Sequence, residues 1–137
     1  MTTKIPTQLR TAAEAKSYML GGRAIITLTS QATNKFLTYK ITVKPEKPDM
    51  HFVWVHTSLG YKFVCTLKPD KKIVPGGMST ECLDYKAFVW AWRHIANNSM
   101  PKKLAVYHNN TCCRCGRDLT TPKSMAAGVG PECIKHM

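Results

Sequence analysis

Hydrophobic and polar residues alternate along four stretches of the first half of the chain, and this period of two predicts β-strands. The stretches are 23–29, 35–44, 51–57 and 61–68, and turns rich in Gly, Pro, Asn or Ser separate them. A fifth, shorter apolar stretch covers 104–107. We expect an antiparallel sheet of four to five strands, with 23–29 and 35–44 paired as a hairpin.

The alternation also predicts which side chains point into the core. In the second stretch one face carries Leu37, Tyr39, Ile41 and Val43, and the other carries Thr38, Lys40, Thr42 and Lys44. The fourth stretch, on the same rule, places inside the residues Tyr61, Phe63, Cys65 and Leu67.

Two helices complete the expected core. Thr11 and Glu14 form a capping box that opens a short helix ending at Leu20. A long helix over 80–97 is nearly encircled by apolar residues, so we expect it to lie across the sheet. These elements predict an α+β fold in which the sheet packs on one long helix, with residues 1–107 as the core domain.

The C-terminal stretch has the ligand spacing of a structural zinc site. Cys112 and Cys115 form a C-x2-C step, and Cys133 and His136 form a C-x2-H step further on. Zinc prefers four Cys or His ligands in a tetrahedron, commonly from two such steps. We therefore expect one structural Zn²⁺ in a treble-clef or zinc-ribbon-like module over 108–137.

The fourth ligand is open on spacing alone. His136 is well spaced but close to the end of the chain, whereas His108 lies shortly before Cys112. Cys113 is adjacent to a ligand and is expected to point away. A disulfide would need an oxidising compartment, and no signal peptide precedes the chain, which favours the cytoplasm.

The charge of the chain favours acidic partners. Twenty Lys and Arg against eight Asp and Glu give a net charge of +12 in 137 residues. Nucleic acid is the first expectation and an acidic protein surface the second. No apolar run is long enough to span a membrane, and the chain is expected to be a monomer or a homodimer.

Lysines interleave with aromatic residues on the predicted strands, and arginines flank the cysteines. Rings on a sheet can stack on bases while Lys and Arg neutralise phosphates, although any single aromatic ring more often belongs to the core, so the net charge is the stronger evidence. The candidate nucleic-acid-binding residues are Lys35, Lys40, Lys62, Lys71, Lys72, Arg114, Arg117 and Lys123.

An enzymatic role is not expected. A catalytic zinc keeps an open coordination position, whereas three Cys and one His close the site. A deaminase would need an H-x-E step beside the metal, which the sequence lacks.

The string C-x2-CGR-x-L-T-x-P-x-S-(x4)-G-x-GP-x-C resembles a small zinc-binding domain of unknown function that is common in bacteriophage proteins. It is carried by Cys112, Cys115, Gly116, Arg117, Leu119, Thr120, Pro122, Ser124, Gly128, Gly130, Pro131 and Cys133. The resemblance extends to 22–28, 36–40 and 88–94, so nearly the whole chain resembles one type of phage protein.

The resemblance implies a zinc site but no established activity. Its histidine upstream of the first cysteine favours His108 over His136 as the fourth ligand. Cys113 departs from the usual pattern and leaves a ligand swap open. A phage origin also implies an alternative function: a host-takeover or anti-defence protein that binds and inhibits a host protein or nucleoprotein complex.

Overall fold

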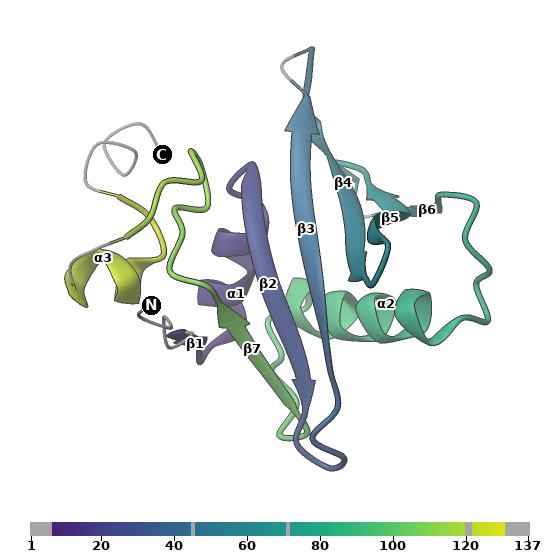
Figure 1. Ribbon diagram of the computed structural model, residues 1–137, viewed down its shortest axis with the longest axis horizontal. Helices are drawn as coiled ribbons and strands as arrows, with labels where there is room; N and C mark the ends of the chain where they lie inside the picture. The colour runs from purple at the N-terminus through teal and green to yellow at the C-terminus, as the bar shows by residue number, and fades with distance from the viewer. Residues whose placement is uncertain (1–6, 45, 71, 120–121, 131–137) are drawn as a thin grey trace.

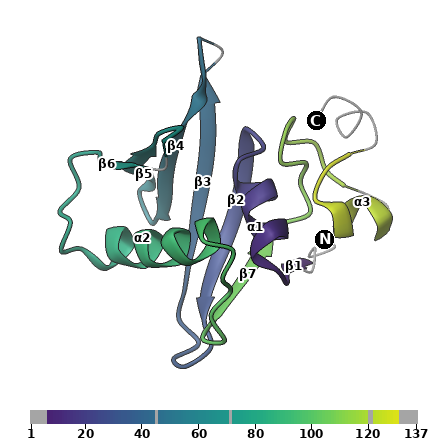
Figure 2. The same cartoon turned by 180° about the vertical axis from the view of Figure 1, so that it is seen from behind.

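The protein is a single antiparallel sheet with its two longer helices on one face (Figures 1 and 2). This computed structural model describes residues 7–44, 46–70, 72–119 and 122–130, with the backbone alone for 122–124. The strands are β1 (Thr7–Leu9), β2 (Arg23–Ser30), β3 (Phe36–Lys44), β4 (Lys47–Thr57), β5 (Gly60–Leu67), β6 (Ile73–Pro75) and β7 (Leu104–His108). The helices are α1 (Ala12–Met19), α2 (Leu83–Ala96) and α3 (Pro122–Ala127).

The strand order is β1-β7-β2-β3-β4-β5-β6. Strands β2 to β6 form a meander in which each strand pairs with the next along the chain. Strand β7 breaks this order, because it inserts between β1 and β2. The C-terminal segment that follows β7 therefore begins one strand in from the edge, next to the short edge strand β1.

The expectation of a four- or five-stranded sheet on one long helix is wrong. The sheet has seven strands, and the described helices have 8, 14 and 6 residues. The two missed strands, β1 and β6, have three residues each, which is too short to show a period of two. Strand β1 pairs with β7, which is far away in the sequence, and β6 pairs with β5 across a turn.

Helix α2 also begins later than the sequence predicts. The Ser79 carbonyl and hydroxyl accept hydrogen bonds from the N–H groups of Cys82 and Glu81, at 3.1 and 3.2 Å, so Ser79 closes a turn and Cys82 becomes the cap. Helix α1, by contrast, opens at the predicted cap, where Thr11 Oγ1 accepts from the Glu14 N–H at 3.1 Å. No described helix is long and apolar enough to cross a membrane.

The core lies between the helices and the inner face of the sheet. The fully buried side chains include Tyr39 on β3 and Phe88 on α2, whose ring centroids are 5.2 Å apart. The Tyr39 hydroxyl donates to the Asp84 carbonyl oxygen at 2.7 Å, so it is buried without losing its hydrogen bond. This pair holds α2 across the middle of the sheet.

A β-bulge changes the faces of β5. Val53 pairs with Cys65, but the next residue of β4, Trp54, pairs with Phe63, so Val64 is an extra residue in β5. The bulge reverses the alternation, so Cys65 faces the core while Phe63 stands beside Trp54 on the open face. The sequence expectation that placed Tyr61 and Phe63 inside is therefore wrong, because a strict period of two cannot anticipate a bulge.

Candidate metal centre and open sheet face

The segment after β7 forms a tight turn that we call the knuckle (residues 111–118). Its ends pair through an isolated bridge between Thr111 and Asp118, and the Cys112 N–H donates to the Arg117 carbonyl at 2.8 Å. At the tip the Gly116 N–H donates to the Cys112 carbonyl at 2.9 Å. Gly116 has φ +78°, a conformation that glycine adopts without strain.

Hydrogen-bond donors from the knuckle and from Gly130 surround the Cys112 sulfur. Burial by itself raises the pKa of the Cys112 thiol, but four hydrogen bonds oppose it and lower the pKa to about 7. The donors are the backbone N–H groups of Gly130, Cys115 and Arg114 and the side chain of Cys115. The thiolate, which is the form that binds zinc, is therefore favoured at Cys112.

These two cysteines fit the first half of a structural zinc site. Cys112 is buried, Cys115 is half-buried, and their side chains are within hydrogen-bonding reach of each other. Among the described residues no group of three or more His, Cys, Asp or Glu could hold a metal ion. The predicted ligands Cys133 and His136 lie outside the described residues.

His108 is held by hydrogen bonds at both ring nitrogens. Its Nε2 lies 2.9 Å from the Met125 carbonyl oxygen, and its Nδ1 accepts from the Asn110 N–H at 3.1 Å. The ring is fully buried and stacks on Tyr18, with centroids 4.7 Å apart. Burial lowers the pKa of His108, although the bond to Met125 opposes this, so a neutral ring that donates from Nε2 fits the site.

Cys113 points away from the turn tip, toward the start of β2. A side chain at Gly21 would place its Cβ only 2.5 Å from the Cys113 sulfur. The Cys113 carbonyl accepts from the Arg23 N–H at 2.7 Å, and its N–H donates to the Gly128 carbonyl at 3.0 Å. Cys113 thus packs the knuckle against the sheet.

The outer face of the sheet, which no described helix covers, presents an aromatic ladder (Phe52, Trp54, His56, Tyr61 and Phe63) on β4 and β5. The ring centroids of Trp54 and Phe63 are 4.9 Å apart, those of His56 and Tyr61 5.3 Å, and those of Phe52 and Phe63 6.3 Å. The rings are half-buried or exposed, so part of each is open to solvent. Neighbouring rings are tilted or edge-on to each other, with interplanar angles of 43°, 51° and 77°, and together they cover two adjacent strands.

Two lysines from β3 lie over these rings. Lys40 Nζ is 4.3 Å from the Tyr61 centroid and 5.8 Å from the Trp54 centroid, and Lys44 Nζ is 5.3 Å from the Phe52 centroid. Lys40 was among the residues predicted to bind nucleic acid. Lys44 was not, although the alternation of β3 already placed it on the same face.

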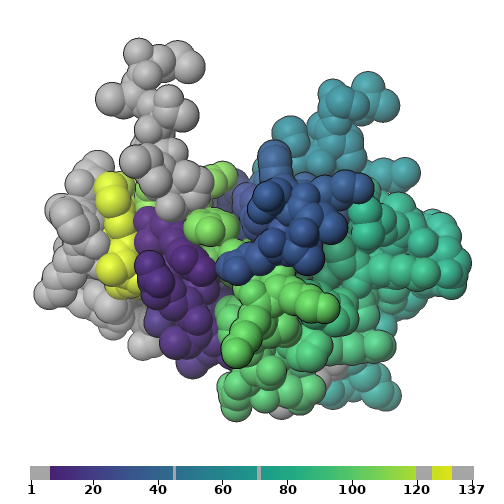
Figure 3. Space-filling view, turned by 90° about the horizontal axis from the view of Figure 1, so that it is seen from below, coloured from purple at the N-terminus to yellow at the C-terminus, as the bar shows by residue number. Residues whose placement is uncertain are grey.

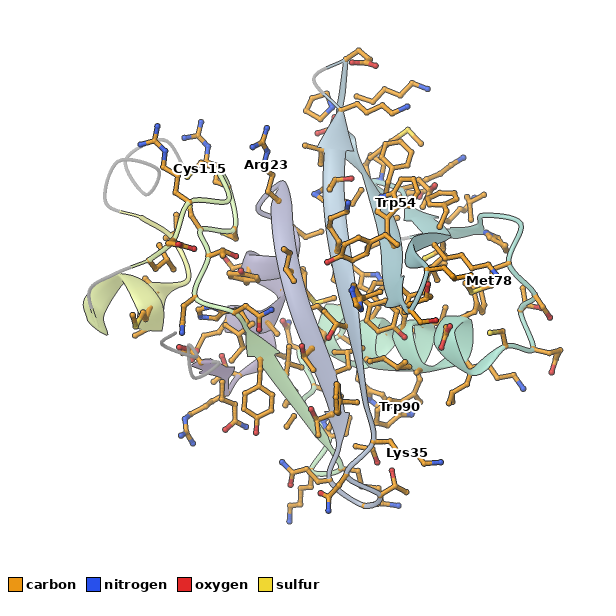
Figure 4. The ribbon with its side chains drawn as sticks, in the orientation of Figure 1. Arg23, Lys35, Trp54, Met78, Trp90 and Cys115 are labelled. Atoms are coloured by element: carbon orange, nitrogen blue, oxygen red, sulfur yellow. The ribbon has the colours of Figure 1, made fainter. Side chains whose placement is uncertain are left out.

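Arginines continue the positive charge from the ladder to the knuckle. Arg23 pairs with Thr42 of β3, and its guanidinium donates to the Cys115 carbonyl oxygen at 3.3 Å. Figure 4 shows Arg23 at the start of β2, between Cys115 and β3. Arg114 and Arg117 are exposed in the knuckle itself. Sequence reasoning selected the two knuckle arginines but missed Arg23, which only the fold brings next to them.

The other predicted basic residues lie elsewhere. Lys35 is in the turn between β2 and β3, and Lys62 pairs with buried Val55, on the opposite side of β5 from the ladder. Lys72 lies 3.8 Å from Asp70. The side chains of Lys71 and Lys123 are outside the described residues.

Comparison with known families adds one finding. The model of DUF6011, a family of unknown function, matches residues 102–137, which include β7, the knuckle and α3. That family carries no activity that could be transferred to this chain. Neither the curated proteins nor the solved structures gave a significant match.

Proposed function

We propose that this protein binds single-stranded nucleic acid on the open face of its sheet. The observation that carries the proposal is the aromatic ladder with Lys40 and Lys44 over its rings. Aromatic side chains on a sheet stack on bases of any sequence, and nearby cations neutralise the phosphates. The bases of a duplex are already stacked and paired, so this arrangement favours a single strand.

The proposed path of the strand runs from the ladder past Arg23 to the knuckle arginines. Arg23 contacts the knuckle through Cys115 and also belongs to the sheet through its pairing with Thr42. The net charge of +12 supplies long-range attraction to the phosphates. The proposed role is to bind the nucleic acid, without a reaction on it.

A structural Zn²⁺ is part of the same proposal. Cys112, Cys115 and Cys133 are the proposed thiolate ligands, and His136 becomes the better fourth candidate because both ring nitrogens of His108 already have partners. When bound, the ion would join the knuckle to the segment that follows α3. Such an ion contributes folding free energy to a small module.

The test measures binding of fluorescein-labelled oligonucleotides by anisotropy near physiological salt. Single-stranded DNA, single-stranded RNA and duplex DNA are compared for the natural protein and for Trp54→Ala. Loss of one stacking ring should weaken single-strand binding by about 5- to 150-fold. Trp90→Ala is the matched control, because Trp90 is the exposed tryptophan of α2 and lies outside the ladder.

Circular dichroism shows whether each variant is folded. Equal affinity for duplex and single strands, or equal effects of Trp54→Ala and Trp90→Ala, would contradict the proposal. A higher affinity for single-stranded DNA or for single-stranded RNA then identifies the nucleic acid that the protein binds.

A further inference from the structure

An apolar groove lies at the hairpin end of the sheet, away from the aromatic ladder. Its walls come from the β2–β3 hairpin, from α2 and from the start of β7, and its volume is about 810 Å³. Figure 4 shows Trp90 and Lys35 at this end of the molecule, and in Figure 3 the hairpin, the segment entering β7 and α2 lie side by side.

The groove gathers large side chains that the fold leaves uncovered. Phe36 is 67% exposed, Leu83 is 64% exposed and Trp90 is 44% exposed. All three line the groove together with half-buried Leu37. Contiguous exposed apolar surface of this kind usually marks an interaction site rather than chance exposure.

The walls of the groove are fixed before any partner arrives. The Gln31 N–H donates to the Lys103 carbonyl at 2.8 Å, which ties the hairpin to the segment before β7. Within the hairpin the Ser30 N–H donates to the Lys35 carbonyl at 2.8 Å. A preformed groove avoids the entropy loss of ordering a loop on binding.

The rim is basic. Lys35 and Lys103 line the groove and are exposed, and no acidic residue is among the described residues that line it. The chemistry of the occupant follows from this combination of apolar walls and positive rim. It should insert one or two bulky apolar side chains and carry Asp or Glu beside them.

A second copy of the chain fits this groove poorly. In a two-fold dimer the same patch meets itself, so the interface would bring together Lys35 and Lys103 of both copies without a described acidic residue of the groove lining to pair with them. Each chain also has a net charge of +12, which opposes self-association.

We propose that this groove docks an acidic peptide segment of a partner protein, with an aromatic or aliphatic anchor beside Trp90 and Leu83 and carboxylates at Lys35 and Lys103. The site is independent of the nucleic-acid face. The protein would then link a nucleic acid to a second protein, with each ligand on its own surface.

The test begins with selection of random peptides displayed on yeast against the full-length protein near physiological salt. Enriched peptides should be rich in Asp and Glu around one or two large apolar residues. A synthetic, fluorescein-labelled copy of the best peptide is then measured by anisotropy. Trp90→Ala and Leu83→Ser should each weaken its binding by about tenfold or more, and Lys35→Glu should weaken it as well.

Trp54→Ala is the control, and it should leave peptide binding unchanged while it weakens the oligonucleotide. The two proposals can therefore fail separately. The peptide proposal is overturned if no acidic peptide is enriched, or if the groove variants bind the peptide as the natural protein does. It is also overturned if Trp90→Ala weakens the oligonucleotide instead, or if sedimentation shows a dimer that this substitution dissociates.

Discussion

Gly21 lies where the turn after α1 meets the knuckle, and it leaves no room for a side chain. A Cβ there would lie 2.5 Å from the Cys113 sulfur and 2.7 Å from the Cys113 carbonyl oxygen. Gly21→Ala should therefore displace the knuckle and lower the free energy of unfolding by about 1–3 kcal/mol. Urea unfolding followed by circular dichroism measures the change.

Gly130→Ala is the matched control for this substitution. Among the described residues, the nearest atom to a Cβ at Gly130 is Leu119 Cδ2 at 4.0 Å, and alanine keeps the N–H that donates to the Cys112 sulfur. This variant should be nearly as stable as the natural protein. Similar losses in both variants would show that packing at Gly21 is not the cause.

His108 provides a second prediction, on the identity of the zinc ligands. His108→Phe keeps a ring beside Tyr18 but leaves the Met125 carbonyl and the Asn110 N–H without their partner. The free energy of unfolding should fall by about 2–4 kcal/mol, because buried polar groups lose hydrogen bonds. One zinc per folded chain should remain, as measured by metal analysis of the purified protein.

Cys115→Ser is the comparison, since it removes a proposed thiolate ligand and should release the zinc. If His108→Phe releases zinc as completely as Cys115→Ser, His108 is a ligand and the hydrogen bonds described above rearrange when the metal binds.

At the scale of elements, the pairing of β5 with β4 decides which rings face the solvent, and the bulge at Val64 keeps that pairing. Deleting Val64 removes the extra residue, so Phe63 stays paired with Trp54 and Tyr61 with His56, and both rings stay on the open face. The deletion should lower the free energy of unfolding, because a buried side chain is lost, but single-strand affinity should stay close to natural. Val64→Ala is the control, because it loses buried volume and keeps the bulge. A loss of affinity in the folded deletion variant alone would show that this pairing depends on the bulge.

The contacts of α1 predict how far the effect of metal removal extends. The Tyr18 hydroxyl donates to the Thr111 carbonyl at 2.8 Å, and Tyr18 also stacks on His108. A chelator should therefore increase amide hydrogen exchange in α1 as well as in the knuckle, because the helix loses this support. Exchange confined to residues 108–130 would instead show that the C-terminal module unfolds alone.

The strands with long alternation were predictable from sequence, and the features that build the open face were not. The hairpin of β2 and β3 is confirmed, because nearly every position of both strands follows the period of two. Tyr61 and Phe63 were misplaced, since a bulge shows itself only in the pairing with β4. Arg23 was missed because its neighbour Cys115 is distant in sequence.

Within the candidate metal site, spacing singled out the C-x2-C turn, and the structure supplies the hydrogen bonds around Cys112. No pattern could show that both nitrogens of His108 have protein partners, because Met125 reaches the ring only through the packing of α3.

At the scale of the whole molecule, the basic path predicts the salt dependence of binding. Five cations lie over the ladder, on the knuckle or between them: Arg23, Lys40, Lys44, Arg114 and Arg117. If all of them contact phosphates, the logarithm of the single-strand association constant should fall with the logarithm of the salt concentration with a slope of about −3.5. Anisotropy titrations over a salt series measure this slope.

Replacing Arg114 and Arg117 by Gln should make the slope shallower by about 1.4. Trp54→Ala should lower the affinity and leave the slope unchanged, because a stacked ring releases no counterions. An unchanged slope in the double arginine variant would place the strand elsewhere than on the knuckle.

The position of β7 affects how the nascent chain completes the sheet. Strand β7 fills the place between β1 and β2, yet the ribosome makes it after all the other strands. Until Leu104–His108 emerges, β1 has no partner and β2 presents an open edge that other chains could join. The sheet is therefore completed only after residues 104–108 have been made, and the edge of β2 stays unpaired while β3 to β6 and α2 are synthesised.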